Sequence, residues 1–329
     1  MLVPEIAPRP PDSRGSAAPH SPEPVSGSPP HLPPRTGECD DPHPRPQGRP
    51  RHRGPADRRH GRRVHRSHRL RDPGGARRAG RGARARPGAW YKAAHDTLGP
   101  QHLTPAQRAL TAVKQAEAER TYERARAYGA AGALAGYKVS GALHQSQQTS
   151  YWCGPAALVI TQSAHDEVGG RSQRDAATLL RTNTSGTAWY GIDINVPNPT
   201  GYPMVDALNH RLPGAGYVPK ALPYSPTATD KANFRQHITH NTDNDYAIAG
   251  NAWEVPGGPH LVGHPNIEIF HWVSIDGYNT DTAAGQVNYL DPVGGVSTSV
   301  ISWAGPVPKS AHLSSDTITT IMGGRGYVW

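Results

Sequence analysis

The sequence predicts an α+β fold for the part of the chain that can form a core. In that part, helix-like patterns come first and strand-like patterns follow, without the strict alternation of a parallel doubly wound sheet. The aromatic residues gather in the same region, since residues 91–329 hold six of the seven Trp, all 13 Tyr and both Phe. Such a composition can bury a core, so we expect the folded protein beyond about residue 90.

Helical patterns fill the first half of this region. Thr104-Pro105 is a typical helix start, because a Thr cap precedes a Pro in the first turn, and this helix should run to about Tyr128. The Gly- and Ala-rich stretch 129–136 then indicates a linker. Further helices are expected at 154–165, 173–181 and 203–212.

Strand patterns, rich in β-branched and aromatic residues, fill the second half. Strands are expected at 246–253, 270–278, 286–291, 296–303 and 326–329. The sequence contains no internal repeat.

Residues 1–90 have a different composition. They contain 19 Arg, no Lys, eight acidic residues and 18 of the 34 Pro, while the remaining 239 residues are nearly neutral. No nucleic-acid partner is expected, because the Arg-rich stretch has no aromatic residue to stack on a base and no fold signature around it. Two interpretations remain. The stretch is either a disordered low-complexity arm, unable to bury enough apolar surface to offset its ordering entropy, or the product of a start site placed too far upstream.

The start of the chain also bears on where the protein is found. No apolar signal-peptide segment lies near Met1, and no run of 18 apolar residues occurs, so no membrane span is expected. We expect a soluble cytoplasmic protein if Met1 is the true start, and a secreted one if the true start differs.

Cys153 is the candidate nucleophile. The Gly154-Pro155 pair leads into an apolar run, and because Pro is tolerated only in the first turn, Cys153 must lie at a helix N-terminus. Unpaired N–H groups and the helix dipole stabilise a thiolate there, and the thiolate is the form that attacks a carbonyl. The alternative is a small buried hydrophobic residue, for which no such position is needed. The only other cysteine, Cys39, lies in the arm.

This segment resembles a known family. Gln147, five intervening residues and then Cys153-Gly154-Pro155-Ala156-Ala157 resemble the active-site start of papain-like cysteine peptidases, most closely the bacterial branch related to the bacteriocin-processing peptidases that remove double-glycine leaders. The resemblance would cover residues 140–310. It implies a two-lobed domain, with a helical lobe, an antiparallel sheet lobe and the site between them. It also implies that the Gln147 amide and the Cys153 backbone N–H form an oxyanion hole, with Gln148 and Gln145 less suited by spacing.

Such a thiolate needs an imidazole to move a proton and a third group to orient that imidazole. Residues 270–278 and 286–291 flank a loop rich in Asn, Asp, Thr and Gly, which indicates a β-hairpin. With the turn centred on Asp281, His271 lies directly opposite Asp291, within reach of a hydrogen bond.

The same register sets Ile275 opposite Val287 and Asp276 opposite Gln286. Asp276 lies five residues from His271 and should project from the other face of the strand, so Asp291 is the expected orienting residue. The resemblance likewise implies a His at a strand start and an Asp before Pro, as in Asp291-Pro292.

A zinc site is not expected. His260, His264 and His271 could be grouped as ligands, but Pro259, Gly263 and Pro265 exclude the helical spacing of a two-His motif. No phosphate-binding glycine loop is present either, so no cofactor and no metal is predicted.

The sequence therefore predicts a cysteine peptidase with catalytic residues Cys153, His271, Asp291 and Gln147, acting on a peptide or protein substrate. The expected divisions are a disordered Pro/Arg/Gly-rich arm (1–89), a helical pro-region or linker (90–138) and a papain-like peptidase domain (139–329). Deamidation or transpeptidation on the same residues is an alternative, and so is a catalytically silent peptide-binding module. No oligomeric state is predicted.

Overall fold

The computed structural model describes residues 87–98, 102–130, 136–166, 172–280 and 285–329. The expected arm, 1–89, lies outside the described residues except for its last three positions, which begin the first helix. The described residues form seven helices and seven strands, all strand pairs being antiparallel. The predicted α+β class is therefore confirmed.

The helices are α1 (Pro87–His95), α2 (Pro105–Ala130), α3 (Cys153–Ser163), α4 (Gln173–Leu179), α5 (Pro203–Arg211), α6 (Ala228–Asp243) and α7 (Ser315–Ile321). The strands are β1 (Tyr137–Val139), β2 (Pro219–Ala221), β3 (Ile248–Glu254), β4 (Ile269–Asn279), β5 (Gln286–Leu290), β6 (Ser310–Ser314) and β7 (Gly326–Val328). Six strands follow the order β2-β7-β3-β4-β5-β6, and β1 pairs with the end of β4.

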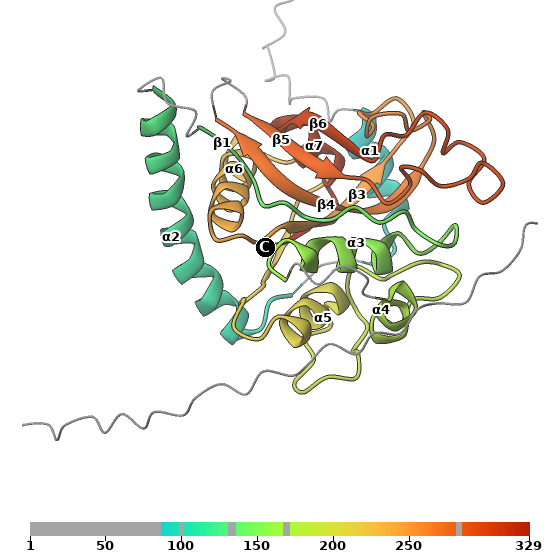
Figure 1. The fold of residues 1–329 in the computed structure, drawn as a ribbon, viewed down its shortest axis with the longest axis horizontal. Helices are drawn as coiled ribbons and strands as arrows, with labels where there is room; N and C mark the ends of the chain where they lie inside the picture. Colours follow the sequence, from blue (N-terminus) through green and yellow to red (C-terminus); the bar gives the residue numbers. More distant parts are fainter. Residues whose placement is uncertain (1–86, 99–101, 131–135, 167–171, 281–284) are drawn as a thin grey trace, which may run out of the picture. The chain divides into compact units, whose positions relative to one another are not determined.

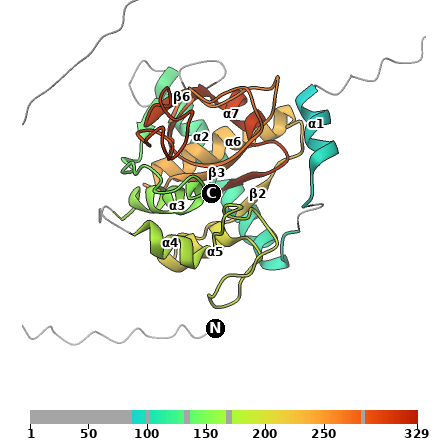
Figure 2. The ribbon, with the colours of Figure 1, turned by 90° about the vertical axis from the view of Figure 1, so that its right-hand side faces the viewer.

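The sheet separates two groups of helices (Figures 1 and 2). Helices α3, α4 and α5 lie on one side, while α6 and α7 lie on the other, with α2 packed along α6. Strand β4 shows the reason, since its apolar side chains alternate between two cores. Val273 and Ile275 join the core that contains Phe234 of α6, and Trp272 joins the core that contains Leu158 of α3.

Helix α2 begins as its sequence indicates. The backbone N–H of Thr104 donates to Gln107 Oε1 at 2.9 Å, and the N–H of Gln107 donates to Thr104 Oγ1 at 3.1 Å, which is a capping box. Its side chains Ala118 and Ala125 are buried in the core with α6. The described elements of the range 90–138 are most of α1, this helix and the first two residues of β1.

The prediction of a strand at 296–303 is wrong. This segment forms successive turns, in which the N–H of Ile301 bonds the carbonyl of Ser297 and the N–H of Ala304 bonds that of Ile301. Its side chains Val296, Ile301 and Trp303 belong to a small separate cluster with Val293 and Val307, and this cluster contains no strand residue. Strand β5 pairs with β4 on one side and with β6 on the other. The sequence patterns did not predict β6, nor β1, β2, α6 and α7.

The predicted register of the β4–β5 hairpin is also wrong. Ile275 pairs with Tyr289 and Asn279 with Gln286, and a β-bulge falls between Ile275 and Gly277. The first part of β4 is thus displaced by two residues from the expected pairing, and the bulge absorbs one more residue at Asp276. The turn centre, Asp281, lies outside the described residues.

Candidate active site

Cys153 is the first residue of α3, as the Gly154-Pro155 pair predicts. Its residue surface is 8% exposed. Gly154 allows α3 to start against the 182–187 loop, because a Cβ at this position would collide with the Oγ1 and Cβ of Thr187. Thr187 is itself held by a hydrogen bond of 2.6 Å between its hydroxyl and that of Thr182.

The electrostatics around Cys153 favour the thiolate. Burial alone would raise the pKa of the thiol, but a hydrogen bond and positive charge from His271 lower it, as do the backbone N–H groups of Trp272 and Gly154. The net effect is a pKa below the ordinary value for cysteine.

His271 lies near the start of β4, between the thiol and a carboxylate. Its Nε2 is 2.9 Å from Asp291 Oδ1, which leaves Nδ1 to hydrogen bond with Cys153. Burial alone would lower the pKa of His271. The charge and hydrogen bond of Asp291, together with those of Cys153, raise it above the ordinary value instead.

Asp291 follows the last residue of β5, and its backbone N–H still bonds the carbonyl of Lys309 at 3.0 Å. If the pairing of Ser274 with Leu290 is continued by one residue, Asp291 is level with Val273, so His271 is its diagonal neighbour. The prediction that Asp291 lies directly opposite His271 is therefore wrong. The expected His271–Asp291 contact nevertheless forms, because a shift of two residues keeps a side chain on the same face.

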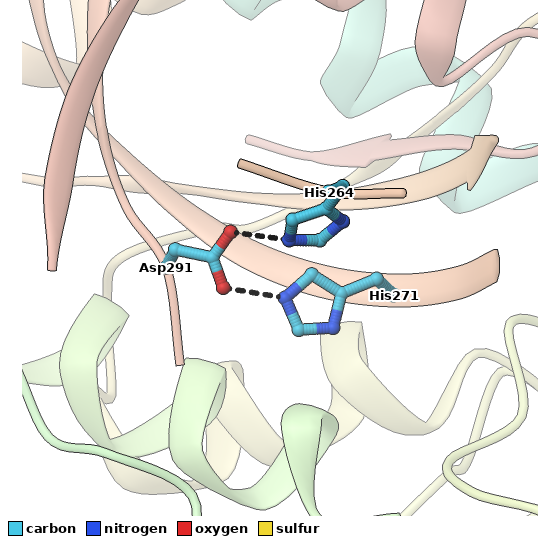
Figure 3. A group of neighbouring side chains, drawn as sticks. All are labelled: His264, His271 and Asp291. Carbon is cyan, nitrogen blue, oxygen red and sulfur yellow. Dashed lines mark hydrogen bonds and ion pairs between the residues drawn. The ribbon is translucent and has the colours of Figure 1, made fainter. Parts of the chain in front are cut away.

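The carboxylate of Asp291 is fully buried and has three N–H donors. Figure 3 shows the two that come from imidazoles. Oδ1 accepts from His271 Nε2 and from the backbone N–H of Val293, both at 2.9 Å, and Oδ2 accepts from His264 Nε2 at 3.0 Å. Burial alone would raise the pKa of Asp291, but the positive charges and hydrogen bonds of His271 and His264 hold it well below its usual range.

The sequence pointed to His264 only as a rejected zinc ligand beside His260 and His271, and its partner Glu254 was not found. The other ring nitrogen of His264, Nδ1, is 2.7 Å from Glu254 Oε1, and both side chains are fully buried. Glu254 ends β3, whereas His264 lies in the loop before β4. No spacing in the sequence connects these positions with Asp291, so only the fold brings them together.

Gln147 is buried, and its side-chain amide has a local partner. Its side-chain Nε2 donates to the carbonyl of Thr149 at 2.7 Å, and its buried Oε1 has no hydrogen-bond partner among the described residues. Gln148 is exposed, and its backbone N–H donates to Gln173. The structure therefore brings Cys153, His271 and Asp291 together and leaves Gln147 with a different contact.

Cys153 and His271 open onto a cavity of about 240 Å³. The aromatic rings of Trp189, Trp272 and Phe270 line it, and Thr97 and Leu98 contribute from the segment between α1 and α2. At the Arg325 side, Asp96 of this segment lies 3.2 Å from the guanidinium. A larger cavity of about 420 Å³, between α1, α7 and residues 253–259, contains none of the predicted catalytic residues.

His264, His271 and Asp291 also have the composition of a metal site, since their donor atoms lie within 4.8 Å of one another. These donor atoms already take part in hydrogen bonds with one another or with the backbone. Each of the two Nε2 atoms faces one carboxylate oxygen at 2.9 to 3.0 Å, and Oδ1 takes the Val293 N–H as well. We therefore describe the three residues as a hydrogen-bonded network.

No known family model matches the sequence, and no curated protein matches it. Within the ranges that the structure describes, no helix is both long enough and apolar enough to cross a membrane.

Proposed function

We propose that residues 139–329 form a papain-like cysteine peptidase domain that hydrolyses peptide bonds through an acyl-enzyme on Cys153. The observation that carries the proposal is the arrangement of the thiol, imidazole and carboxylate. A thiol with a lowered pKa begins a helix, its hydrogen-bond partner is His271, and the second nitrogen of that ring is held by a buried carboxylate.

The reaction follows from these contacts. The Cys153 thiolate attacks the peptide carbonyl carbon and forms a C–S bond, while the backbone N–H groups at the start of α3 face the developing oxyanion. His271 Nδ1–H gives its proton to the leaving nitrogen as the C–N bond breaks, which leaves a thioester. Nδ1 then takes a proton from water as the water oxygen attacks the thioester. The acid product leaves, and the thiolate–imidazolium pair is restored.

The test uses the full chain and a fluorescently labelled, unstructured protein such as casein. Incubation with a thiol-directed peptidyl epoxide should modify Cys153 and spare Cys39, as read by mass spectrometry. Cys153→Ala should abolish hydrolysis and change the melting temperature little, because it removes chemistry and few packing atoms. A loss of stability of about 2 to 5 kcal/mol with unchanged hydrolysis would instead assign Cys153 to packing.

Gln147 remains a predicted oxyanion donor. For this role the Gln147 amide, which has two N–H donors, must donate one to the substrate oxygen while the other can stay on the Thr149 carbonyl. Gln147→Ala is then expected to lower kcat by about 10² to 10³, the effect of losing one oxyanion donor, with the pH of thiolate formation unchanged. The matched control is Gln148→Ala, and a larger loss in that variant would place the donor at residue 148.

A further inference from the structure

The imidazole of His264 bridges two buried carboxylates. Its Nδ1 is 2.7 Å from Glu254 Oε1 and its Nε2 is 3.0 Å from Asp291 Oδ2, and all three side chains are fully buried. An ionised carboxylate is an acceptor only, so with both carboxyl groups ionised each ring nitrogen must carry a proton to donate. His264 is therefore an imidazolium in this arrangement.

The pKa of His264 is consistent with that state. Burial alone would lower it and the nearby charge of His271 opposes protonation, but the hydrogen bonds from Asp291 and Glu254 raise the pKa above its ordinary value. Glu254 is fixed in turn, since its Oε2 accepts from His260 Nδ1 at 2.8 Å and from the backbone N–H of Leu261 at 3.1 Å.

We propose that His264 is a positioning residue for the reaction, a buried imidazolium that Glu254 holds in place and that fixes the Asp291 carboxylate behind His271. The inference rests on the proposed function. Without a donor at Oδ2, half of the Asp291 carboxylate would be buried and unsatisfied, and a second buried carboxylate would face it with no cation between them. Both effects would weaken the hold of Asp291 on the reacting imidazole.

The charged and titratable groups around this bridge come from several elements. They are Glu254 of β3, His260 of the following loop, His271 of β4, Tyr289 of β5, Asp291 after β5, and His144, whose Nε2 bonds the Asp291 carbonyl at 2.8 Å. Lys309 adds a positive charge near His144. Among them, only Glu254 and Asp291 bond the His264 ring directly.

The first test compares His264→Gln with His260→Gln in the full chain, with Cys39→Ser so that Cys153 is the sole thiol. The two histidines bond the same glutamate, but His260 bonds its other oxygen and Asn266, which makes it the matched control. We expect kcat/KM to fall about 10- to 100-fold in His264→Gln, the range known for outer-shell partners of metal-bound histidines. It should fall at most about 3-fold in His260→Gln, because the Leu261 N–H still bonds Oε2 and the new amide can donate to it as well.

Iodoacetamide gives a second readout that needs no substrate. The rate of Cys153 alkylation against pH reports thiolate formation. In His264→Gln this transition should move to higher pH, because one positive charge has left a buried group that contains two carboxylates and a thiolate. A purely structural role would lower the melting temperature and leave the pH of thiolate formation unchanged.

Glu254→Gln tests the same bridge from the other end. The amide still accepts from His264 but no longer supplies the negative charge that keeps the ring protonated, so the ring should lose its proton at lower pH. The alkaline limb of kcat/KM should therefore move to lower pH. An unchanged alkaline limb in a folded Glu254→Gln protein would overturn the inference.

The wild-type protein provides a test that no folding defect can obscure. In ¹⁵N NMR the His264 ring, identified through its contact with Trp303 at a centroid distance of 4.8 Å, should show two protonated nitrogens at pH 7. A neutral ring at pH 7 would overturn the inference. If Cys153→Ala keeps full activity, the proposed function has failed and the inference with it. If Cys153→Ala is inactive while His264→Gln matches His260→Gln, only the positioning role is lost.

Discussion

Two buried aspartates on the β4–β5 hairpin have opposite surroundings. Asp291 receives three N–H donors, two of them from imidazoles, whereas Asp276 at the bulge receives the side-chain amide of Asn288 at 2.6 Å. Burial alone would raise the pKa of both. Two cations outweigh burial at Asp291 and hold its pKa well below the ordinary value, while at Asp276 burial dominates and raises the pKa to about 6.

The difference shows that burial does not decide the charge of a carboxyl group by itself. Asp291 is 0% exposed and Asp276 is 3% exposed, so their access to water is nearly the same. The charge of the partners decides the outcome, because an imidazolium favours the ionised form far more than a neutral amide does. One aspartate is thus suited to hold a protonated histidine, and the other is suited to a structural role.

The largest expected contrast is in activity. Asp291→Asn should lower kcat/KM at least about 100-fold, because an amide can present the wrong partner to His271 and favour the wrong tautomer. Asp276→Asn should stay within a few-fold of wild type, since Asp276 bonds Asn288 and has no bond to His271. Casein hydrolysis at pH 7 measures both. If Asp276→Asn is the inactive variant, the assignment of Asp291 as the orienting residue is wrong.

The next contrast is in stability against pH. The pKa of Asp276 is higher in the folded protein than the ordinary 3.8, so the folded state binds more protons between about pH 4 and pH 6. The free energy of unfolding should therefore fall as pH rises through this window, by about 2 to 3 kcal/mol at 1.36 kcal/mol per pKa unit. Asp276→Asn should lack this fall. Urea titrations from pH 4 to 8 check it, and parallel curves for the two proteins would contradict it.

The smallest expected effect is that of metal removal. Hydrogen bonds already occupy the donor atoms of His264, His271 and Asp291, so dialysis against EDTA should leave the hydrolysis rate and melting temperature unchanged. Adding zinc back should not raise the rate. Loss of activity on dialysis, restored by zinc, would show that a metal ion holds this carboxylate in place of the network.

The sequence predicted the parts of the site that local chemistry determines. Gly154-Pro155 located the start of α3 and with it Cys153, and period-two alternation placed His271 and Asp291 on one face of a hairpin. It did not reveal the bulge at Asp276, because nothing local requires one there. The bridge from Glu254 through His264 to Asp291 could not be predicted, since the path of the loop before β4 alone brings these residues together.

The errors in the predicted fold have a similar origin. Segment 296–303 has the alternation of a strand, yet its side chains bury one another. Helix α6 was missed because its exposed face is rich in polar residues, and only Phe234 and Ile238 supply its large buried apolar side chains. In both cases tertiary packing determined the structure, and local patterns did not.

Gly154 has a consequence for how active-site motifs are understood. In the proposed reaction the neighbouring cysteine forms the new bond, whereas the glycine provides room, because Thr187 fills the space where any larger side chain would begin. Gly154→Ala would push the start of α3 away from the 182–187 loop and carry the sulfur with it, although reacting groups tolerate displacements of only about 0.5 Å. The Cys-Gly pair therefore combines a chemical constraint at position 153 with a steric one at position 154. A residue larger than glycine could stand at position 154 only if residue 187 were smaller than threonine.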